Sequence, residues 1–405
     1  MQKDSAGTVH RALSGRRTGQ GPVRRFGVKR LRKNALRVEE SMNRTEELYE
    51  LCKQAASPDP GMLAVSKAHW DNIAKPLDGL GLLEQMITKI AGIQNQEMVT
   101  LRKKAVVVMC SDNGVVEEGV TQTDSSVTAV VSENFAKGIA SVNRMAAVAG
   151  ADVIPVDIGI NREVSHPNLR NCKIAYGTRN LAKEPAMTRE QAVEGIFTGI
   201  TLVKELREQG YRILGTGEMG IGNTTTSSAI ASVLLDLPVE VVTGKGAGLS
   251  KEGVRHKIQV IRDAIAFHHP DPADPVAVLS CLGGFDIAGM TGLFLGGALY
   301  RVPVVIDGLI SSVAALLAKR ICPCAVDYML PSHMSKEPSS RKIMEELGLK
   351  PVIDGQLALG EGTGTALLFP MLDMANEVYL ENSTFDKVNI EAYRKFEEEE
   401  QGGIE

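Results

Sequence analysis

The chain has 405 residues, a net charge of −4 and 43% apolar residues, with only 4% aromatic residues and 40 glycines. It is long enough to bury the core of one large domain and a smaller unit, and its composition excludes a disordered or fibrous protein. No apolar run approaches the roughly 20 residues of a membrane span, and the six scattered cysteines favour reduced thiols. We therefore expect a cytoplasmic protein that neither spans a membrane nor holds a metal.

The first 41 residues differ from the rest in charge. Residues 1–40 contain eleven Lys and Arg against three acidic residues, a net of +8, which leaves −12 for residues 41–405. This segment resembles a nucleic-acid-binding arm or a targeting peptide, although the acidic remainder argues against nucleic-acid binding. Residues 38–42 can also be encoded by a purine-rich ribosome-binding sequence ending in ATG. We hypothesise that Met42 is the natural start and that residues 1–41 are a disordered tail.

The remaining chain divides into a helical part and an alternating part. Residues 42–104 predict a small helical domain, because apolar residues recur at three- and four-residue spacings in 46–56 and 80–93. Short apolar runs, each followed by a Gly-containing or polar loop, then predict strands at 105–110, 152–158, 212–214, 276–282, 302–306 and 324–330. Helices are predicted at 224–235, 311–319 and 365–375. Residues 105–380 are thus expected to form an α/β domain, a Rossmann-like parallel sheet with helices on both faces, followed by a helical, acidic tail at 381–405.

The loops after these strands contain the candidate binding residues, because ligands of such sheets bind beyond the carboxyl ends of the strands. The segment 215–226 has four glycines and leads into a helix whose N-terminus favours an anion. A Gly-rich turn is also a common structural feature. The candidates here are Glu218, Met219, Gly220, Ile221, Gly222, Asn223 and Thr224.

Further candidates follow later strands. Lys245, between glycines, and Lys257 are alternative phosphate-binding cations, although a surface lysine is the default interpretation of each. Ser335 offers a hydroxyl near a strand end. Asp286 and Asp307 follow apolar runs, where a carboxylate either orients ribose hydroxyls or caps a helix.

One acidic residue stands apart, since Glu361 lies between Gly360 and Gly362. Without neighbouring side chains to shield it, its carboxylate can approach a ligand, and removal from water would raise its pKa toward the range of a general base. The alternative is a loop glutamate that caps its own helix. Leu359 and Met219 are candidates for contact with a flat base.

Together these stretches resemble one family, the nicotinate-nucleotide–dimethylbenzimidazole phosphoribosyltransferases of cobalamin lower-ligand synthesis. The resemblance runs from about Met62 to Ala375. It rests on the segments 112–120, 217–225, 283–288, 307–312, 332–338 and 359–364, which include the string Gly217-Glu-Met-Gly-Ile-Gly-Asn-Thr-Thr. The sequence departs from the usual family residues at Asn113, Thr226, Asp286 and Ser339–Ser340.

The resemblance implies specific roles for several residues. It implies a catalytic base at Glu361, a second active-site glutamate at Glu218, a phosphate-binding lysine at Lys257 and a phosphate-side serine at Ser335. It further implies a homodimer without a cofactor, acting on nicotinate mononucleotide and 5,6-dimethylbenzimidazole or a similar base. Two alternatives stay open: the same transfer to adenine or a phenolic base, and a non-catalytic nucleotide-binding regulator.

Overall fold

The computed structural model describes residues 44–393. The predictions about the tail at residues 1–41, about Met42 as the natural start and about the acidic end of the chain concern residues outside this range, apart from residues 381–393.

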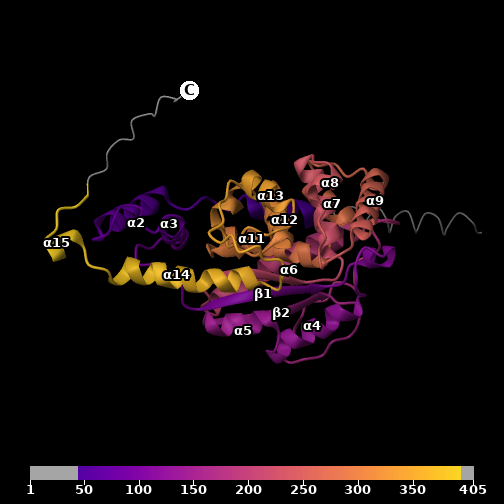
Figure 1. The fold of residues 1–405 in the computed structure, drawn as a ribbon, viewed down its shortest axis with the longest axis horizontal. Helices are drawn as coiled ribbons and strands as arrows, with labels where there is room; N and C mark the ends of the chain where they lie inside the picture. Colours follow the sequence, from indigo (N-terminus) through magenta and orange to yellow (C-terminus); the bar gives the residue numbers. More distant parts are fainter. Residues whose placement is uncertain (1–43, 394–405) are drawn as a thin grey trace, which may run out of the picture. The chain divides into compact units, whose positions relative to one another are not determined.

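A six-stranded, entirely parallel sheet lies in the middle of the described chain (Figure 1). Its order is β3-β2-β1-β4-β5-β6. The strands are β1 (Lys104–Ser111), β2 (Ala151–Gly159), β3 (Arg170–Asn171), β4 (Ile213–Met219), β5 (Val304–Ile306) and β6 (Met329–Pro331). The strand order reverses between β1 and β4, and open α/β sheets bind ligands beyond the carboxyl ends of the strands at such a point.

Helices cover both faces of the sheet, as predicted, because successive side chains of a strand point to opposite faces. Val107 and Met109 of β1 belong to one buried apolar cluster, whereas Val106 and Val108 belong to another. The first cluster includes side chains of α6 (Arg189–Glu208), α7 (Asn223–Leu235), α9 (Lys251–His268), α10 (Pro275–Leu282), α11 (Phe285–Tyr300), α12 (Leu309–Ile321) and α13 (Ser340–Leu347). The second includes side chains of α3 (Leu82–Gln94), α4 (Ser126–Lys137), α5 (Ser141–Val148) and α14 (Thr363–Glu381). In Figure 1, α4 and α5 lie on the opposite side of the strands from α7 and α12.

The N-terminal part of the described chain is helical, as predicted. Residues 44–52 form a helix, and α2 (Pro60–Asn72) begins where the Asp59 side chain accepts the N–H of Gly61. α2 packs on α3, and α3 packs on α14. The shorter elements are η1 (Gly114–Glu118), α8 (Val239–Val242), η2 (Pro323–Tyr328) and α15 (Phe385–Val388). Within residues 44–393, no helix combines the length and apolarity that crossing a bilayer requires.

The prediction of a strand at residues 276–282 is wrong, because this apolar run forms α10. Pro275 occupies the first turn, and the Asp274 side chain accepts the N–H of Ala277 at 3.0 Å. Both features start a helix. A continuous apolar run does not by itself distinguish a buried strand from a buried helix.

The predicted strand at 324–330 is also mostly wrong. Residues 323–328 form η2, whose first turn contains Pro323, and only Met329–Pro331 pair with β5. The buried apolar residues of this stretch are therefore divided between the helical turn, with Ala325 and Tyr328, and the strand, with Met329 and Leu330.

The strand predicted at 212–214 is longer than expected. β4 continues to Met219 and pairs with β1 throughout, so Glu218 and Met219 lie on the strand itself. Its glycines allow the start of α14 to approach the strand closely. A Cβ at Gly215 would lie 1.8 Å from Thr365 Cγ2, and one at Gly217 would lie 2.4 Å from the Glu361 carbonyl oxygen. The Gly-rich sequence therefore serves strand–loop packing as well as the turn that follows.

Candidate active site

A cleft of about 240 Å³ lies where the loops after β4, β5 and β6 meet the loop before α14. It gathers the candidates from four separate segments, as the topology requires. The cleft is lined by Val131, Glu218, Met219, Gly220, Ile221, Asn223, Thr224, Gly246, Ala247, Asp307, Gly308, Leu309, Ile310, Ser311, His333, Ser335, Glu337, Ala358, Leu359, Gly360 and Glu361. Of the candidates chosen from the sequence, all but Gly222, Lys245, Lys257 and Asp286 line it.

Glu361 stands in an unusual turn at the entrance to α14. Its φ is 63°, and the flanking Gly360 and Gly362 have φ of 82° and 94°. Left-handed backbone is unfavourable for a residue with a side chain and is typical of functional sites. The Glu361 Oε2 atom accepts the N–H of Val142 at the start of α5, at 3.2 Å. Burial raises the pKa of Glu361, the N–H of Val142 opposes that rise, and the charge of Asp307 adds to it.

A second acidic side chain, Glu218, lies beside this turn. A Cβ at Gly360 would lie 2.4 Å from Glu218 Oε1, so the Glu218 carboxyl group lies close against the backbone of Gly360. Burial, and then the charge of Asp286, raise the pKa of Glu218 to about 8. Asn223 donates its amide both to Glu218 and, at 3.0 Å, to Asp286. The raised pKa favours the protonated carboxyl form of Glu218, which can donate a hydrogen bond.

Asp286 lies behind the cleft rather than in it. Its side chain is fully buried and accepts the N–H of Ile287 as well as the Asn223 amide. Burial raises the pKa of Asp286 to about 6. Of the two interpretations of Asp286, the observed contacts match a carboxylate at a helix start; a contact with ribose stays a prediction.

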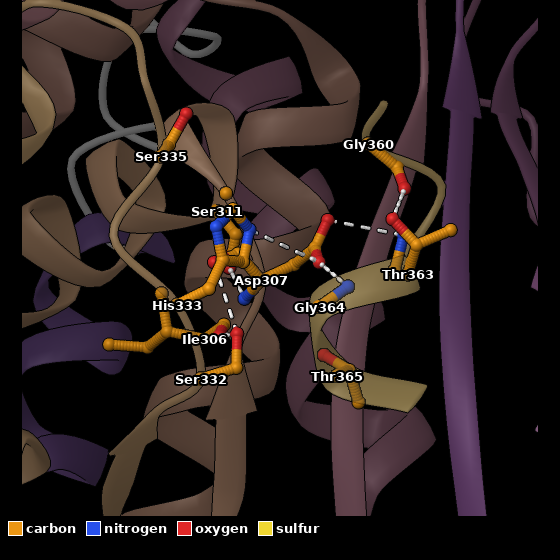
Figure 2. Close-up of polar contacts among 12 residues, drawn as sticks. Ile306, Asp307, Ser311, Ser332, His333, Ser335, Gly360, Thr363, Gly364 and Thr365 are labelled. Atoms are coloured by element: carbon orange, nitrogen blue, oxygen red, sulfur yellow. Dashed lines mark hydrogen bonds and ion pairs between the residues drawn. The ribbon is translucent and has the colours of Figure 1, made fainter. Parts of the chain in front are cut away.

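Asp307 lines the cleft at the end of β5 and is 2% exposed. Figure 2 shows its carboxylate between His333 and the first turn of α14. It accepts the N–H of Gly364 at 2.7 Å and that of Gly362 at 3.2 Å. Here too the helix-capping interpretation matches the contacts, and ribose binding stays a prediction.

The two candidate lysines lie in different environments. Lys257 is fully buried beside the cleft, and its ammonium donates to Thr224 Oγ1 at 2.8 Å. Burial lowers the pKa of Lys257 to about 8, and the charge of Glu337 opposes that effect. Lys245 is exposed and lines a neighbouring hollow that shares Glu337 with the cleft. Only Lys257 is thus fixed directly behind a cleft-lining side chain.

Comparison with known proteins gives a consistent result. The sequence matches the phosphoribosyltransferase family over residues 55–390. The Clostridium acetobutylicum protein named nicotinate-nucleotide–dimethylbenzimidazole phosphoribosyltransferase is 49% identical over 347 residues, covering 86% of this chain and 99% of that protein. The Acetivibrio thermocellus protein of the same name is 48% identical, covering 80% and 92%. This chain belongs to the nicotinate-nucleotide–dimethylbenzimidazole phosphoribosyltransferase family.

The fold of this family agrees with the described chain. The crystal structure of the phosphoribosyltransferase of that name from Thermus thermophilus is 36% identical, with a TM-score of 0.77. The similarity covers 82% of this chain and 99% of that one. The resemblance predicted from the motifs is therefore confirmed, and so is the Rossmann-like fold class.

The sequence did not single out several residues of this phosphoribosyltransferase cleft. His333 and Glu337 lie within the motif at 332–338, so their place in the motif was the available signal. Gly246 and Ala247 adjoin Lys245 in the same loop. Val131 comes from the middle of α4, and nothing in its local sequence indicates a cleft.

The departures from the usual family residues do not line the cleft. Asn113 is 1% exposed and donates its amide to the Ile221 carbonyl at 3.3 Å. Thr226, inside α7, donates its hydroxyl to the Asn223 carbonyl. Ser339 and Ser340 are buried at the start of α13. These substitutions therefore act from behind the residues that face the cleft.

Proposed function

We propose that this protein transfers the 5-phosphoribosyl group of nicotinate mononucleotide to 5,6-dimethylbenzimidazole or a similar base. The products are nicotinate and the α-ribazole 5′-phosphate nucleotide. Membership of the family and 49% identity to a relative of that name support the reaction. The arrangement of acidic and basic groups around the cleft supports the roles below.

The reaction needs little activation of its leaving group. The pyridinium nitrogen of nicotinate mononucleotide is already cationic, so the breaking bond to the anomeric carbon leaves its electron pair on that nitrogen. One azole nitrogen of the base attacks the opposite face of the anomeric carbon, and inversion gives the α-nucleotide. The proton on the other azole nitrogen must then be removed.

Glu361 is the proposed proton acceptor. Its carboxylate lines the cleft, and its raised pKa brings it closer to the range in which a general base is effective at neutral pH. Glu218 lies beside it, and the raised pKa of Glu218 favours the protonated form, which is suited to donate a hydrogen bond to a polar atom of a substrate. Positioning the base over the anomeric carbon adds to the rate.

The phosphate is proposed to bind at the α7 side of the cleft. The Thr224 hydroxyl, Ser335 and the backbone around Gly246 line that side, with Lys257 directly behind Thr224. An ammonium group and the N-terminus of a 13-residue helix both favour an anion. Lys245 is the alternative cation.

The flat base is proposed to contact apolar side chains at the cleft. Met219 lines it from the end of β4, and Leu359 lines it from the loop before α14. The Leu359 side chain is 58% exposed, so burial against a planar ring would remove apolar surface from water.

The observation that supports this function most directly is the position of Glu361, an acid on a left-handed turn that is half-buried in a cleft at the ends of β4 and β5. The test is to mix the protein with nicotinate mononucleotide and dimethylbenzimidazole and to measure released nicotinate and the new nucleotide by chromatography. Equimolar release of nicotinate and formation of the nucleotide is expected. Binding of both compounds without turnover would instead favour the non-catalytic regulator.

Adenine and phenolic bases are the alternative acceptors. Competition among dimethylbenzimidazole, adenine and a phenol in one reaction gives the order of preference directly. Phenolic acceptors would yield a product with a C–O bond, which mass spectrometry distinguishes from the N-linked nucleotide.

We also propose a cytoplasmic homodimer with a small helical domain at 42–104, a large domain at 105–380 and a C-terminal segment at 381–405. Apolar side chains on two helices that pack together support the dimer: Val148 of α5 is 87% exposed and Met374 of α14 is 64% exposed. Light scattering coupled to size-exclusion chromatography should give twice the chain mass, and a monomer mass would contradict the dimer.

A further inference from the structure

Both carboxylate oxygens of Asp307 accept hydrogen bonds from the backbone of the segment that follows Glu361. Oδ2 accepts the N–H of Gly362, the residue after Glu361, at 3.2 Å. Oδ1 accepts the N–H of Gly364 at 2.7 Å. Figure 2 shows the Asp307 carboxylate beside Gly364 at the first turn of α14. The carboxylate therefore holds the backbone immediately beyond the proposed proton acceptor.

The backbone of Asp307 is in turn bound by Ser311 of α12, which contacts β4. Its N–H donates to Ser311 Oγ at 3.1 Å, and Ser311 Oγ lies 2.5 Å from Thr216 Oγ1 on β4. Thr365, in the first turn of α14, donates its hydroxyl to the Thr216 carbonyl at 3.2 Å. The loop is thus tied to β5 through Asp307 and to β4 through Thr365.

The loop needs such restraint because its backbone is unfavourable. Glu361 and its two glycine neighbours all have left-handed φ values, which persist only where the surroundings determine them. There is also no room for a side chain at Gly364, since a Cβ there would lie 2.2 Å from His333 Cδ2 and 2.8 Å from Asp307 Oδ1. A small shift of this turn would move the Glu361 carboxylate relative to the cleft.

We propose that Asp307 is a positioning residue of the transfer reaction, which fixes the direction of Glu361 by holding the N–H groups of Gly362 and Gly364. This inference rests on the proposed role of Glu361 as the proton acceptor. It assigns the Asp307 carboxylate to the catalytic loop instead of to the ribose of the substrate.

Asp307 also affects the basicity of its neighbour. The titratable groups that face it are His333, with Nε2 3.9 Å from Oδ1, and the carboxyl groups of Glu218 and Glu361. Burial is the largest cause of the raised pKa of Glu361, and the negative charge of Asp307 raises that pKa further. Because Glu361 must be ionised to accept a proton, loss of that charge moves the acid limb of the kcat–pH profile to lower pH.

The test is steady-state kinetics of Asp307→Asn across pH. The amide oxygen replaces only one acceptor, and its NH2 group opposes the second N–H. We expect kcat to fall about 10–100-fold, because a displacement near 1 Å in a catalytic group has effects of that order. The KM for nicotinate mononucleotide should stay near the wild-type value, and the acid limb should move to lower pH.

Asp157→Asn is the matched control. Asp157 is also 2% exposed, and it likewise accepts a backbone N–H, from Ile160 at 2.9 Å, but it pairs with Lys173 and has no contact with the loop at 360–364. Its variant should leave the acid limb in place. A limb that moves equally in both variants would overturn the proposal.

A double variant separates positioning from general loss of structure. In a Glu361→Gln background, Asp307→Asn should lower kcat no further, because the group that it positions is already gone. If the kcat of the double variant falls by the product of the two single-variant reductions, the positioning role is overturned. A wild-type kcat in Asp307→Asn would also overturn it. If Glu361→Gln alone retains kcat, the proton-acceptor assignment fails instead, which is a distinct outcome.

Ser311→Ala provides a second route if Asp307→Asn does not fold. Removing the Ser311 hydroxyl releases the Asp307 N–H and should lower kcat in the same way but less, with the same lack of effect in the Glu361→Gln background. Because Ser311→Ala keeps the Asp307 charge, its acid limb should stay in place, and a Ser311→Ala enzyme with unchanged kcat would overturn the proposal.

Discussion

The cleft is bordered by two turns that share one backbone design. α7 begins after Gly222 and α14 begins after Gly362; each glycine has φ of 94°, and neither helix start has a side-chain cap at that residue. What differs is the charged group behind each turn. Lys257 lies behind the first through Thr224, whereas Asp307 binds the second directly.

The same backbone turn at a helix N-terminus can therefore favour or disfavour an anion, depending on the charged group behind it. A helix N-terminus attracts anions, and a buried ammonium beside it strengthens that preference. A carboxylate that already occupies the first N–H groups of the helix removes the preference and repels a second anion. The α7 turn is thus suited to a phosphate, and the α14 turn is suited to presenting an acid.

The largest expected effect comes from removing the acid of the α14 turn. Glu361→Gln keeps the size of the side chain but cannot accept the azole proton, so kcat should fall about 10²–10⁴-fold. Dissociation constants for both substrates, measured by calorimetry, should change little. A kcat close to that of the wild type would show that the α14 turn does not supply the proton acceptor.

The α7 turn is tested by its lysine. Lys257→Ala should weaken binding of nicotinate mononucleotide by about 10–100-fold, the usual range for a hydrogen bond to a charged group, with a smaller effect on kcat. Lys245→Ala is the matched variant, an exposed lysine in the adjacent loop. If affinity falls only in Lys245→Ala, the phosphate cation is Lys245.

The two turns should also respond differently to pH. Because burial lowers the pKa of Lys257 to about 8, its ammonium loses a proton as the pH rises through that value. Affinity for nicotinate mononucleotide should therefore decline from pH 7 to pH 9 in the wild type, and the decline should be much smaller in Lys257→Ala. Calorimetric titrations at several pH values measure this directly.

The smallest effect concerns the stability cost of Glu218, which lies between the turns. Its folded pKa of about 8 is above the ordinary value of 4.5, so folding favours the protonated form and stability declines as pH rises from 4.5 to 8. Glu218→Gln removes this titration. Urea unfolding should show the variant gaining about 1 kcal/mol over wild type between pH 5 and pH 8, since the side chain is only partly buried. An equal difference at both pH values would contradict the raised pKa.

Much of the fold followed from local patterns. The apolar run at 105–110 is flanked by a charged residue and a polar loop and forms a buried strand, and the small-residue stretch at 224–235 forms a helix as predicted. The run at 276–282 misled because six of its seven residues are apolar, so the sequence has no alternation of apolar and polar residues that would separate a strand from a helix. There, the Asp274 cap and Pro275 were the decisive local signals.

By itself, the sequence determined the family, the parallel α/β class and the acid between two glycines, because motifs and apolar periodicity are properties of neighbouring residues. Only the tertiary structure decided that Lys257 rather than Lys245 lies behind the α7 turn, and that Asp307 holds the α14 turn. The reason is that a buried charge acts through the groups packed around it, and those groups come from segments far away in the chain.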